Sequence, residues 1–349
     1  MTKRGLSMKI ARMITGLLAL LLLSGCAAPA GESDEPYTME LFAMDTIMKL
    51  TVYNPHGREA AESAATRIQE VEKLLSVTEE GSEIYTVNHS GGTPVTVSQD
   101  TSRLLALALE LCESTGGALD VTILPVLQAW GFTTDAYRVP GEQELSKLLE
   151  QVDYRKISLE ENRLTLPDGM QLDLGAVAKG YTGDQLMEIF KNEGVTSAIV
   201  ELGGNVQALG AKPDGSPWRV GIQSPEGNGY AGVLEIVDQA VVTSGGYQRY
   251  FEQDGETYWH ILNPKDGRPA RSELASVTIV AKEGTLCDGL STALFVMGAE
   301  DAAAYWRENG GFDFILIRDT GEVVITEGLE GCFFLYGDWA DHPMEVVHP

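Results

Sequence analysis

The sequence predicts an α+β fold in which mixed and antiparallel sheets pack against helices. Short strand segments follow one another across tight turns, such as Asp254-Gly255 and Asp319-Thr320-Gly321, instead of alternating strictly with helices. No internal repeat has a fixed period. The residues after Pro36 suffice for one large domain or two, and we expect a single domain over residues 37–349.

The first half of the chain predicts both helices and strands. Ala60, Ala64 and Ile68 would share one face of a helix, and Ser98 or Asp100 would cap a later one. The expected elements are a strand region over Glu40–Val52, helices over Glu59–Leu75, Ser98–Ser114 and Gly141–Gln151, a turn-rich stretch over Thr78–Val97, and a hairpin within Lys156–Asp173 turning at Glu161-Asn162.

The second half predicts a helix over Ala178–Glu193, with Gly194 after its end, and then short strands separated by glycine-rich turns. The expected strands are Ala198–Leu202, Trp218–Gln223, Val233–Val237, Ala240–Thr243, Gln248–Phe251, Tyr258–Leu262, Ser276–Val280, Phe314–Arg318 and Val323–Thr326. Helices are expected over Cys287–Met297 and Ala299–Glu308, and a closing strand within the aromatic stretch Gly331–Pro349.

The N-terminus has the pattern of an export signal. Basic residues precede an apolar run over Ile14–Leu23, which is too short to span a bilayer. The run ends in Leu23-Ser24-Gly25-Cys26, which resembles the bacterial lipobox. We expect a signal peptide over residues 1–25, with translation starting at Met1 or Met8, a lipid on Cys26 and a flexible tether over residues 26–36. The alternative is an ordinary secretory signal with a chance cysteine.

The net charge of −26 excludes some partners. Such a surface would repel nucleic acid and anionic lipid headgroups, so we expect no nucleic acid and membrane contact through the lipid anchor only. Cys112, Cys287 and Cys332 form no C-x-x-C pattern, which argues against a disulfide framework or zinc site. Cys112 lies in an apolar run and is expected to be buried.

One stretch with chemical potential runs from Asp173 to Asp184. A strand would deliver Asp173, and a helix would begin near Ala176 or Ala178. The amides of a helix start suit a phosphate, and Lys179 would add a positive charge. The alternative is a plain strand–turn–helix with a solvated lysine.

A second stretch begins at Cys287 and contains Asp288 and Thr292. The two lie four residues apart, so a helix would place them on one face. A carboxylate and a hydroxyl are hard oxygen ligands that suit Mg²⁺. The alternative is an acidic residue that interacts with the helix dipole.

A third set of segments combines glycines with a histidine: Gly203-Gly204-Asn205, Ser244 to Tyr247, and His260 to Gly267. The glycines would let backbone approach a ligand closely. His260 could be a general base near neutral pH, or a structural strand histidine.

In this order, these segments resemble the FAD:protein FMN transferase family, the ApbE-type flavin transferases, whose fold is related to the T-fold. The resemblance runs from Met44-Asp45-Thr46 to Ala293. It implies an enzyme that binds FAD and Mg²⁺ and transfers FMN to a Ser or Thr hydroxyl of a target flavoprotein, releasing AMP. Members of the family are often exported lipoproteins, so we expect this chain at the extracytoplasmic face of the cell membrane.

The resemblance also implies roles for individual residues. The metal would be held by Asp288, the Thr292 hydroxyl and the main-chain carbonyl of Ala176. The target hydroxyl would lose its proton to His260 or to Asp288, and the sequence does not decide between them. Contacts with FAD would come from Met44, Ala118, Leu119, Asp120, Asp173, Lys179, His260 and Ile261.

The chain departs from the family pattern at three places: Asp45 replaces a usual glycine, Thr78 stands near a usual aromatic residue, and Cys287-Asp288-Gly289 replaces a usual Ala-Asp-Ala. The loss of a stacking ring would weaken flavin retention or alter the balance between transfer and hydrolysis. Two alternatives therefore stay open: hydrolysis of FAD to FMN and AMP, and a lipid-anchored protein that binds flavin without turnover.

Overall fold

The computed structural model describes residues 35–227 and 229–349. The predicted signal peptide, Cys26 and nearly all of the tether lie outside the described residues. Residues Pro36–Pro349 form one compact unit. In the described part of the chain, no helix combines the length and apolarity needed to cross a membrane.

A mainly antiparallel sheet forms the centre of this unit. Nine strands of the described residues pair in the order β1-β2-β6-β7-β10-β13-β14-β15-β17. Their bounds are Tyr37–Ala43, Thr46–Tyr53, Ser197–Leu202, Asn205–Leu209, Ala240–Gly245, Leu274–Ala281, Asp313–Arg318, Val323–Thr326 and Met344–Val347. All pairs are antiparallel except β15 with β17. The α+β prediction is confirmed.

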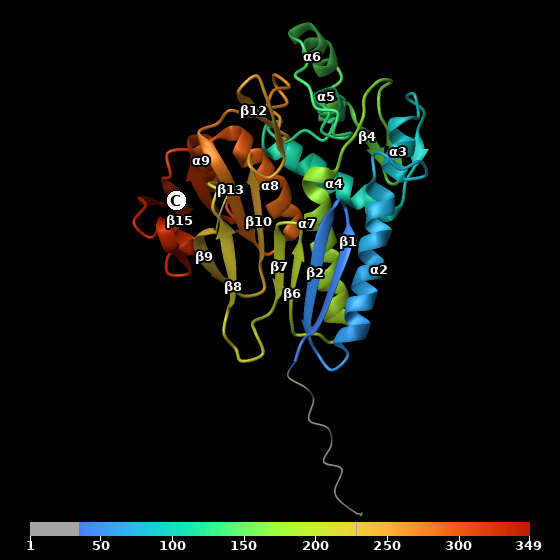
Figure 1. The fold of residues 1–349 in the computed structure, drawn as a ribbon. Coiled ribbons are helices and arrows are strands. Elements are labelled where there is room, and N and C mark those ends of the chain that lie inside the picture. Colours follow the sequence, from blue (N-terminus) through green and yellow to red (C-terminus); the bar gives the residue numbers. More distant parts are fainter. Residues whose placement is uncertain (1–34, 228) are drawn as a thin grey trace, which may run out of the picture. The chain divides into compact units, whose positions relative to one another are not determined.

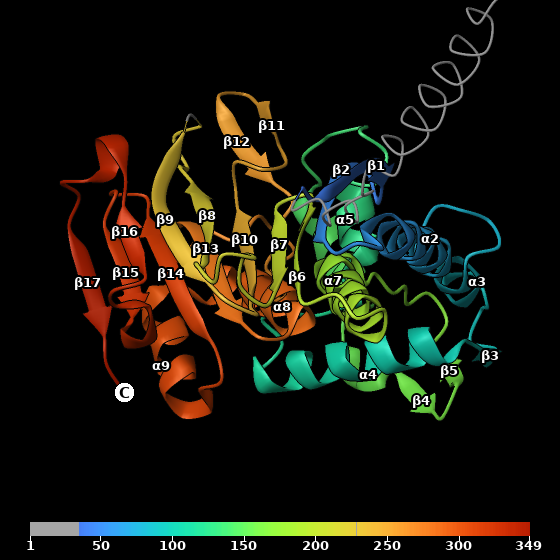
Figure 2. The ribbon, with the colours of Figure 1, turned by 90° about the horizontal axis from the view of Figure 1, so that it is seen from below.

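The large sheet is covered on both faces, as Figure 2 shows. Strand residues alternate between the two sides, so Val241 and Val280 face one apolar cluster while Val242 and Ile279 face another. The first cluster lies under a small sheet of β16, β9 and β8. The bounds of these strands are Phe333–Leu335, Tyr230–Ile236 and Trp218–Gln223.

Helices cover the other face. They are α2 (Gly57–Leu75), α7 (Gly175–Asn192), α8 (Gly284–Met297) and α9 (Ala299–Asn309), with α4 (Gln99–Ser114) packed beneath α7 and α8. The predicted helices are confirmed, and α4 begins at the Ser98 cap, whose hydroxyl accepts from the Thr101 amide. Cys112 lies in this helical core and is buried.

Smaller elements complete the unit (Figure 1). They are α3 (Glu83–Asn88), α5 (Leu124–Trp130), α6 (Glu142–Leu149), the sheet of β3 (Val95–Thr96), β5 (Arg163–Thr165) and β4 (Ser158–Glu160), and the hairpin β11–β12 (Tyr250–Gln253, Glu256–Trp259). The hairpins at Glu161-Asn162 and Asp254-Gly255 are confirmed. Strands β16 and β17 confirm the closing strand expected near the C-terminus.

Two hairpins correct the predicted strands. The expected single strand region over Glu40–Val52 is wrong: β1 and β2 pair across a turn at Met44-Asp45. Both turn residues have positive φ, 49° and 59°, which a two-residue hairpin turn of this hand requires. Strand β7 was not predicted, and it pairs with β6 across Gly203-Gly204.

Candidate active site

The hairpin turns of β1–β2 and β6–β7 meet at one end of the large sheet. A Cβ placed on Gly203 would lie only 2.4 Å from Cγ2 of Thr46, so only glycine allows this approach. Strand β10 ends at Gly245 on the same end, because Val242 pairs with Asn205 in the adjacent strand. Three predicted motifs that are distant in the sequence therefore lie together.

Helices α7 and α8 cross antiparallel at a pair of glycines. A Cβ on Gly180 would lie 2.1 Å from the carbonyl oxygen of Gly284, so the two backbones are in direct contact. Further along α8, Gly289 faces Val177, which is nearer the start of α7. A glycine inside a helix makes that helix less stable than an alanine would. The crossing nevertheless requires these glycines, because a Cβ would collide with the neighbouring helix.

This crossing places the Asp288 carboxylate against the backbone of α7. Its Oδ2 accepts a hydrogen bond from the Gly180 amide at 2.8 Å. The side chain is buried, and burial raises the pKa of Asp288, opposed chiefly by the positive charge of Lys179. Asn205 also lowers this pKa, although its Nδ2 makes no hydrogen bond of normal geometry within the described residues.

Thr292 is one turn further along α8 than Asp288, and Ala176 is one turn before Gly180 on the antiparallel α7. The Thr292 hydroxyl lies 3.4 Å from the Ser244 hydroxyl at the end of β10. Asp288 and Thr292 therefore lie on one face of α8, and Asp288 is in direct contact with α7 through the Gly180 amide.

Asp173 lies immediately before α7, and the prediction that a strand delivers it is wrong. The backbone from 166 to 174 is irregular, because its amides pair with loops instead of a strand. Asn88 exchanges two hydrogen bonds with Leu172, and the Asp173 amide donates to the Val121 carbonyl. The Asp173 Oδ1 accepts from the Gly175 amide at 2.7 Å. The helix begins at Gly175, slightly earlier than predicted.

The positive charge of Lys179 acts on two carboxyl groups and one histidine of this region. It lowers the pKa values of Asp173, Asp288 and His260. For both carboxyl groups burial is the larger influence and raises the pKa. Side chains from four different segments therefore share one electrostatic environment.

His260 follows directly after β12, so its predicted place within a strand is wrong. Its Nδ1 lies 3.1 Å from the carbonyl oxygen of Arg249. A carbonyl oxygen only accepts, so this bond requires the proton on Nδ1 and leaves the Nε2 lone pair free. Burial lowers the pKa of His260 to about 4; the hydrogen bond to the Arg249 carbonyl opposes this lowering, and the positive charges of Arg249 and Lys179 add to it. The ring is therefore neutral near pH 7.

Met44 occupies the turn of the first hairpin. Its amide donates to Glu72 Oε1 of α2 at 2.6 Å, and its sulfur lies 3.9 Å from the Thr182 hydroxyl of α7. A positive φ in a non-glycine residue costs free energy, and these contacts hold it in place. Asp45, where the family usually has glycine, shares this conformation.

The remaining residues predicted to contact FAD are Ala118, Leu119, Asp120 and Ile261. Ala118, Leu119 and Ile261 are buried. The Asp120 carboxylate accepts from the amide and hydroxyl of Thr122 and from the Tyr154 amide. Burial raises the pKa of Asp120. Its side chain thus holds the loop in shape, and a ligand would meet chiefly the backbone around it.

The donor set fits a small hard cation. It offers one carboxylate, one hydroxyl and one main-chain carbonyl, all oxygen ligands of the kind that Mg²⁺ prefers. Burial raises the pKa of the Asp288 carboxyl, so a bound cation would stabilise its charged form. In the described part of the chain, no three His, Cys, Asp or Glu side chains gather as a metal cluster.

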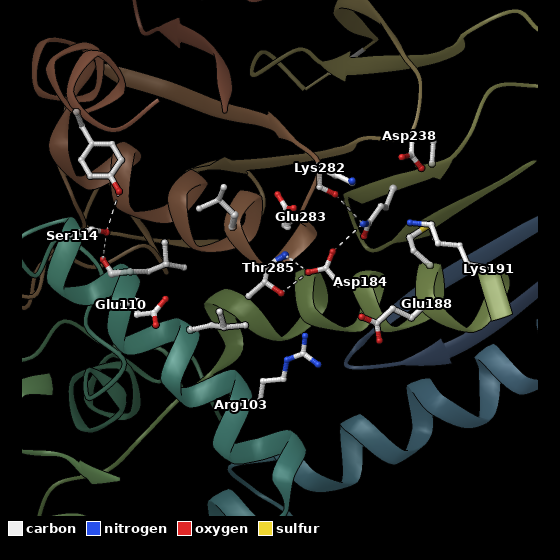
Figure 3. A pocket seen from close by; sticks show the side chains of 17 residues that line it. Arg103, Glu110, Ser114, Asp184, Glu188, Lys191, Asp238, Lys282, Glu283 and Thr285 are labelled. Carbon is white, nitrogen blue, oxygen red and sulfur yellow. Dashed lines mark hydrogen bonds between the residues drawn. The ribbon is translucent and has the colours of Figure 1, made fainter. Parts of the chain in front are cut away.

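Sequence reasoning assigned no role to Asp184, the last residue of its motif. Asp184 accepts from the amides of Gly284 and Thr285 at 2.6 and 2.9 Å and from the Thr285 hydroxyl. It therefore caps the start of α8 from the neighbouring helix. Asp184 also borders a cavity of about 570 Å³ (Figure 3), which lies at the opposite end of α8 from Thr292.

Comparisons with known proteins agree with this architecture. The family model described as the ApbE family matches residues 44–316. The FAD:protein FMN transferase of Treponema pallidum is 34% identical over 316 residues, covering 84% of this chain and 87% of that protein. The Vibrio cholerae protein of the same name is 33% identical, covering 85% and 90% of the two chains.

Solved structures agree as well. The ApbE protein of Thermotoga maritima superposes with a TM-score of 0.81 at 31% identity, covering 85% of this chain and 99% of that one. The flavinyl transferase ApbE of Pseudomonas stutzeri gives a TM-score of 0.77 at 30% identity, covering 86% and 97%. The chain therefore belongs to the ApbE family of FAD:protein FMN transferases.

Proposed function

We propose that this enzyme transfers FMN from FAD to a Ser or Thr hydroxyl of an exported or membrane flavoprotein, that the reaction depends on Mg²⁺, and that AMP is released. The observation that carries the proposal is the α7–α8 crossing. It places Asp288 against Gly180 and within the electrostatic influence of Lys179, with Thr292 one turn further along α8.

Asp288, the Thr292 hydroxyl and the Ala176 carbonyl would hold the Mg²⁺. A bound Mg²⁺ neutralises charge that develops on phosphate oxygens during phosphoryl transfer. The buried Asp288 is suited to this role, because burial leaves its carboxylate without enough compensating charge. Lys179 supplies a second positive charge on the same side.

The chain's other residues would bind and orient FAD. Met44 is held on a rigid turn, and Asp173 stands before the first turn of α7. The segment Ala118–Asp120 offers backbone groups, and Ile261 and His260 border the same side of the sheet. Positioning of the reacting phosphorus relative to the acceptor accounts for much of the rate in phosphoryl transfer.

His260 is the better candidate for the base. Its Nε2 is free and unprotonated near pH 7. The Asp288 Oδ2 is occupied by the Gly180 amide, and as a metal ligand the carboxylate would be a poor proton acceptor. In the proposed step His260 Nε2 takes the acceptor hydroxyl proton, and the acceptor oxygen forms a bond to the FMN phosphorus. The pyrophosphate P–O bond breaks, and AMP leaves with the bond electrons.

The test compares three variants with FAD and Mg²⁺, each with and without an acceptor flavoprotein. Asp288→Ala should abolish both FMN transfer and FAD cleavage. His260→Gln should slow transfer by roughly 10²-fold or more, the usual worth of a general base. Thr243→Val, on β10 but outside the donor set, should behave as wild type. Unchanged acceptor labelling by Asp288→Ala would refute the proposal.

The same experiment separates the alternatives. Rapid release of FMN and AMP without acceptor would identify a hydrolase. Tight FAD binding with no turnover in either condition would identify a flavin-binding protein.

We also propose that Cys26 carries a lipid that holds the enzyme at the extracytoplasmic face of the cell membrane. The support is the sequence pattern around Cys26, together with the tether before β1. An anchored enzyme would meet membrane flavoproteins where they present their acceptor hydroxyls.

A further inference from the structure

Three hydroxyl groups form a chain that ends at Thr292. The Ser244 hydroxyl, at the end of β10, lies 2.8 Å from the Ser291 hydroxyl and 3.4 Å from the Thr292 hydroxyl of α8. The Ser291 hydroxyl lies 2.9 Å from the main-chain oxygen of Asp288. Ser291 is fully buried, and the other two side chains are half-buried.

The direction of each hydrogen bond in this chain follows from its last acceptor. A carbonyl oxygen cannot donate, so Ser291 gives its only hydrogen to Asp288. Ser291 can then only accept from Ser244, which uses the single Ser244 hydrogen. In the remaining contact Thr292 must therefore donate to Ser244.

This direction matters for a cation. A hydroxyl that binds a cation must turn its lone pairs toward the cation and its hydrogen away. With its hydrogen directed at Ser244, the Thr292 oxygen keeps its lone pairs available for a cation. The Thr292–Ser244 separation of 3.4 Å is long for a hydroxyl hydrogen bond, so the contact orients the hydroxyl more than it stabilises the fold.

We propose that Ser244 is a positioning residue for the metal site: through Ser291 and the Asp288 carbonyl it fixes the orientation of the Thr292 hydroxyl as a cation ligand. The inference rests on the proposed function, because it takes Thr292 as a metal ligand. It explains why a hydroxyl residue ends β10 beside α8, where apolar residues otherwise fill the interface.

A matched control lies one residue earlier on β10. Thr243 pairs with Thr278 of β13, their hydroxyls 2.8 Å apart, and contacts no member of the Ser244 chain. Thr243→Val removes a hydroxyl from the same strand and keeps the side-chain shape. It therefore reports what the loss of a strand hydroxyl does by itself.

The experiment measures Mn²⁺ binding by the loss of the free-ion electron paramagnetic resonance signal, with FAD present. Ser244→Ala should raise the Mn²⁺ dissociation constant about 10-fold, the lower end for removal of a group that orients a metal ligand. Ser291→Ala should also raise it, because Ser244 then lacks its acceptor and can donate to Thr292. Thr243→Val should bind as wild type. The thermal midpoint without metal shows whether each variant is folded.

Asp288→Ala, measured in parallel, separates the two proposals. If Asp288→Ala loses Mn²⁺ binding while both serine variants bind as wild type, the positioning role of Ser244 is wrong and the metal site stands. If Asp288→Ala binds as tightly as wild type, the proposed metal site is wrong, and the role of Ser244 with it. Equal weakening by Thr243→Val and Ser244→Ala would also contradict the positioning role.

Discussion

At the scale of single residues, burial shifts the pKa values of His260 and of Asp288 in opposite directions. Loss of water disfavours the charged form of each group. It lowers the pKa of His260 to about 4 and raises the pKa of Asp288. The histidine is thereby kept neutral near pH 7, with its Nε2 unprotonated, and a bound cation would stabilise the charged form of the Asp288 carboxylate.

The pKa of His260 predicts a pH profile. The ring loses its catalytic form only when protonated, so the acidic limb of kcat/KM should lie well below pH 6.5, toward pH 4. Transfer rates measured from pH 4 to 8 test this. An acidic limb centred near 6.5 in the wild type would show that His260 titrates normally and that the proposed base is misassigned. The same linkage makes this histidine's contribution to stability full above pH 6.5 and lost as the pH falls toward 4.

The buried charge of Asp288 is expected to lower the stability of the metal-free fold while it serves metal binding. Its raised pKa means that the buried charge destabilises the metal-free fold at neutral pH. Asp288→Asn keeps an acceptor for the Gly180 amide and removes the charge. It should raise the metal-free Tm by about 2 °C, the shift that about 1 kcal/mol gives in a chain of this size. Differential scanning calorimetry measures this.

Asp288→Ala is the control for that measurement, because it removes the acceptor as well and leaves the Gly180 amide unpaired. A lower Tm for Asp288→Asn than for wild type would show that the carboxylate stabilises the fold even without metal.

Several residue roles were readable in the sequence, and others depended on contacts between distant segments. The four-residue spacing of Asp288 and Thr292 predicts their common helix face, and the structure has both in α8. The capping of α8 by Asp184 was not predictable, because nothing near Gly284 in the sequence names its partner 100 residues away. The tautomer of His260 likewise depends on the Arg249 carbonyl.

At the scale of elements, the α7–α8 crossing determines where the donor groups lie. A helix-interior glycine costs about 1 kcal/mol relative to alanine, so propensity alone would favour Gly180→Ala. The crossing reverses the sign, because the added Cβ would lie 2.1 Å from a backbone oxygen that cannot move aside. We expect Gly180→Ala to destabilise the fold by roughly 1–3 kcal/mol, as overpacking does. Urea unfolding measures it.

Gly183→Ala is the matched control one turn along α7. Its Cβ would meet the oxygen at the end of the Gln207 side chain, which can shift at the cost of its hydrogen bond to Asp184, whereas the backbone facing Gly180 cannot shift. A larger loss for Gly183→Ala than for Gly180→Ala would contradict the account of the crossing.

The bounds of the strands show which predictions the local sequence pattern can support and which it cannot. Strands β8 and β15 begin and end where they were predicted, because turn residues bound both segments and each buries one face or both against a sheet. The turn at Met44-Asp45 was missed, because Met and Asp carry no glycine signal for positive φ. Strand β7 was missed because Gly203-Gly204 was assigned to ligand approach, whereas it also makes the hairpin turn.

At the scale of the whole molecule, the anchor proposal predicts that loss of the lipid changes where the enzyme is found in the cell and leaves its catalytic activity unchanged. Cys26→Ala should leave FAD cleavage and labelling of a soluble acceptor unchanged in vitro, because Cys26 lies outside the unit that holds the site. In cells, the variant should leave the membrane fraction and label membrane flavoproteins less. Fractionation followed by in-gel flavin fluorescence measures both. Equal labelling of membrane targets would show that the anchor is dispensable.

The central claim is that the α7–α8 crossing builds a metal-dependent site for FMN transfer. The most direct measurement is the intact mass of an acceptor flavoprotein subunit after incubation with FAD, Mg²⁺ and enzyme. The account predicts an added mass of one FMN less one water with the wild-type enzyme, and none with Asp288→Ala or with a chelator present. An unmodified acceptor with the wild type, or a modified one with Asp288→Ala, would contradict it.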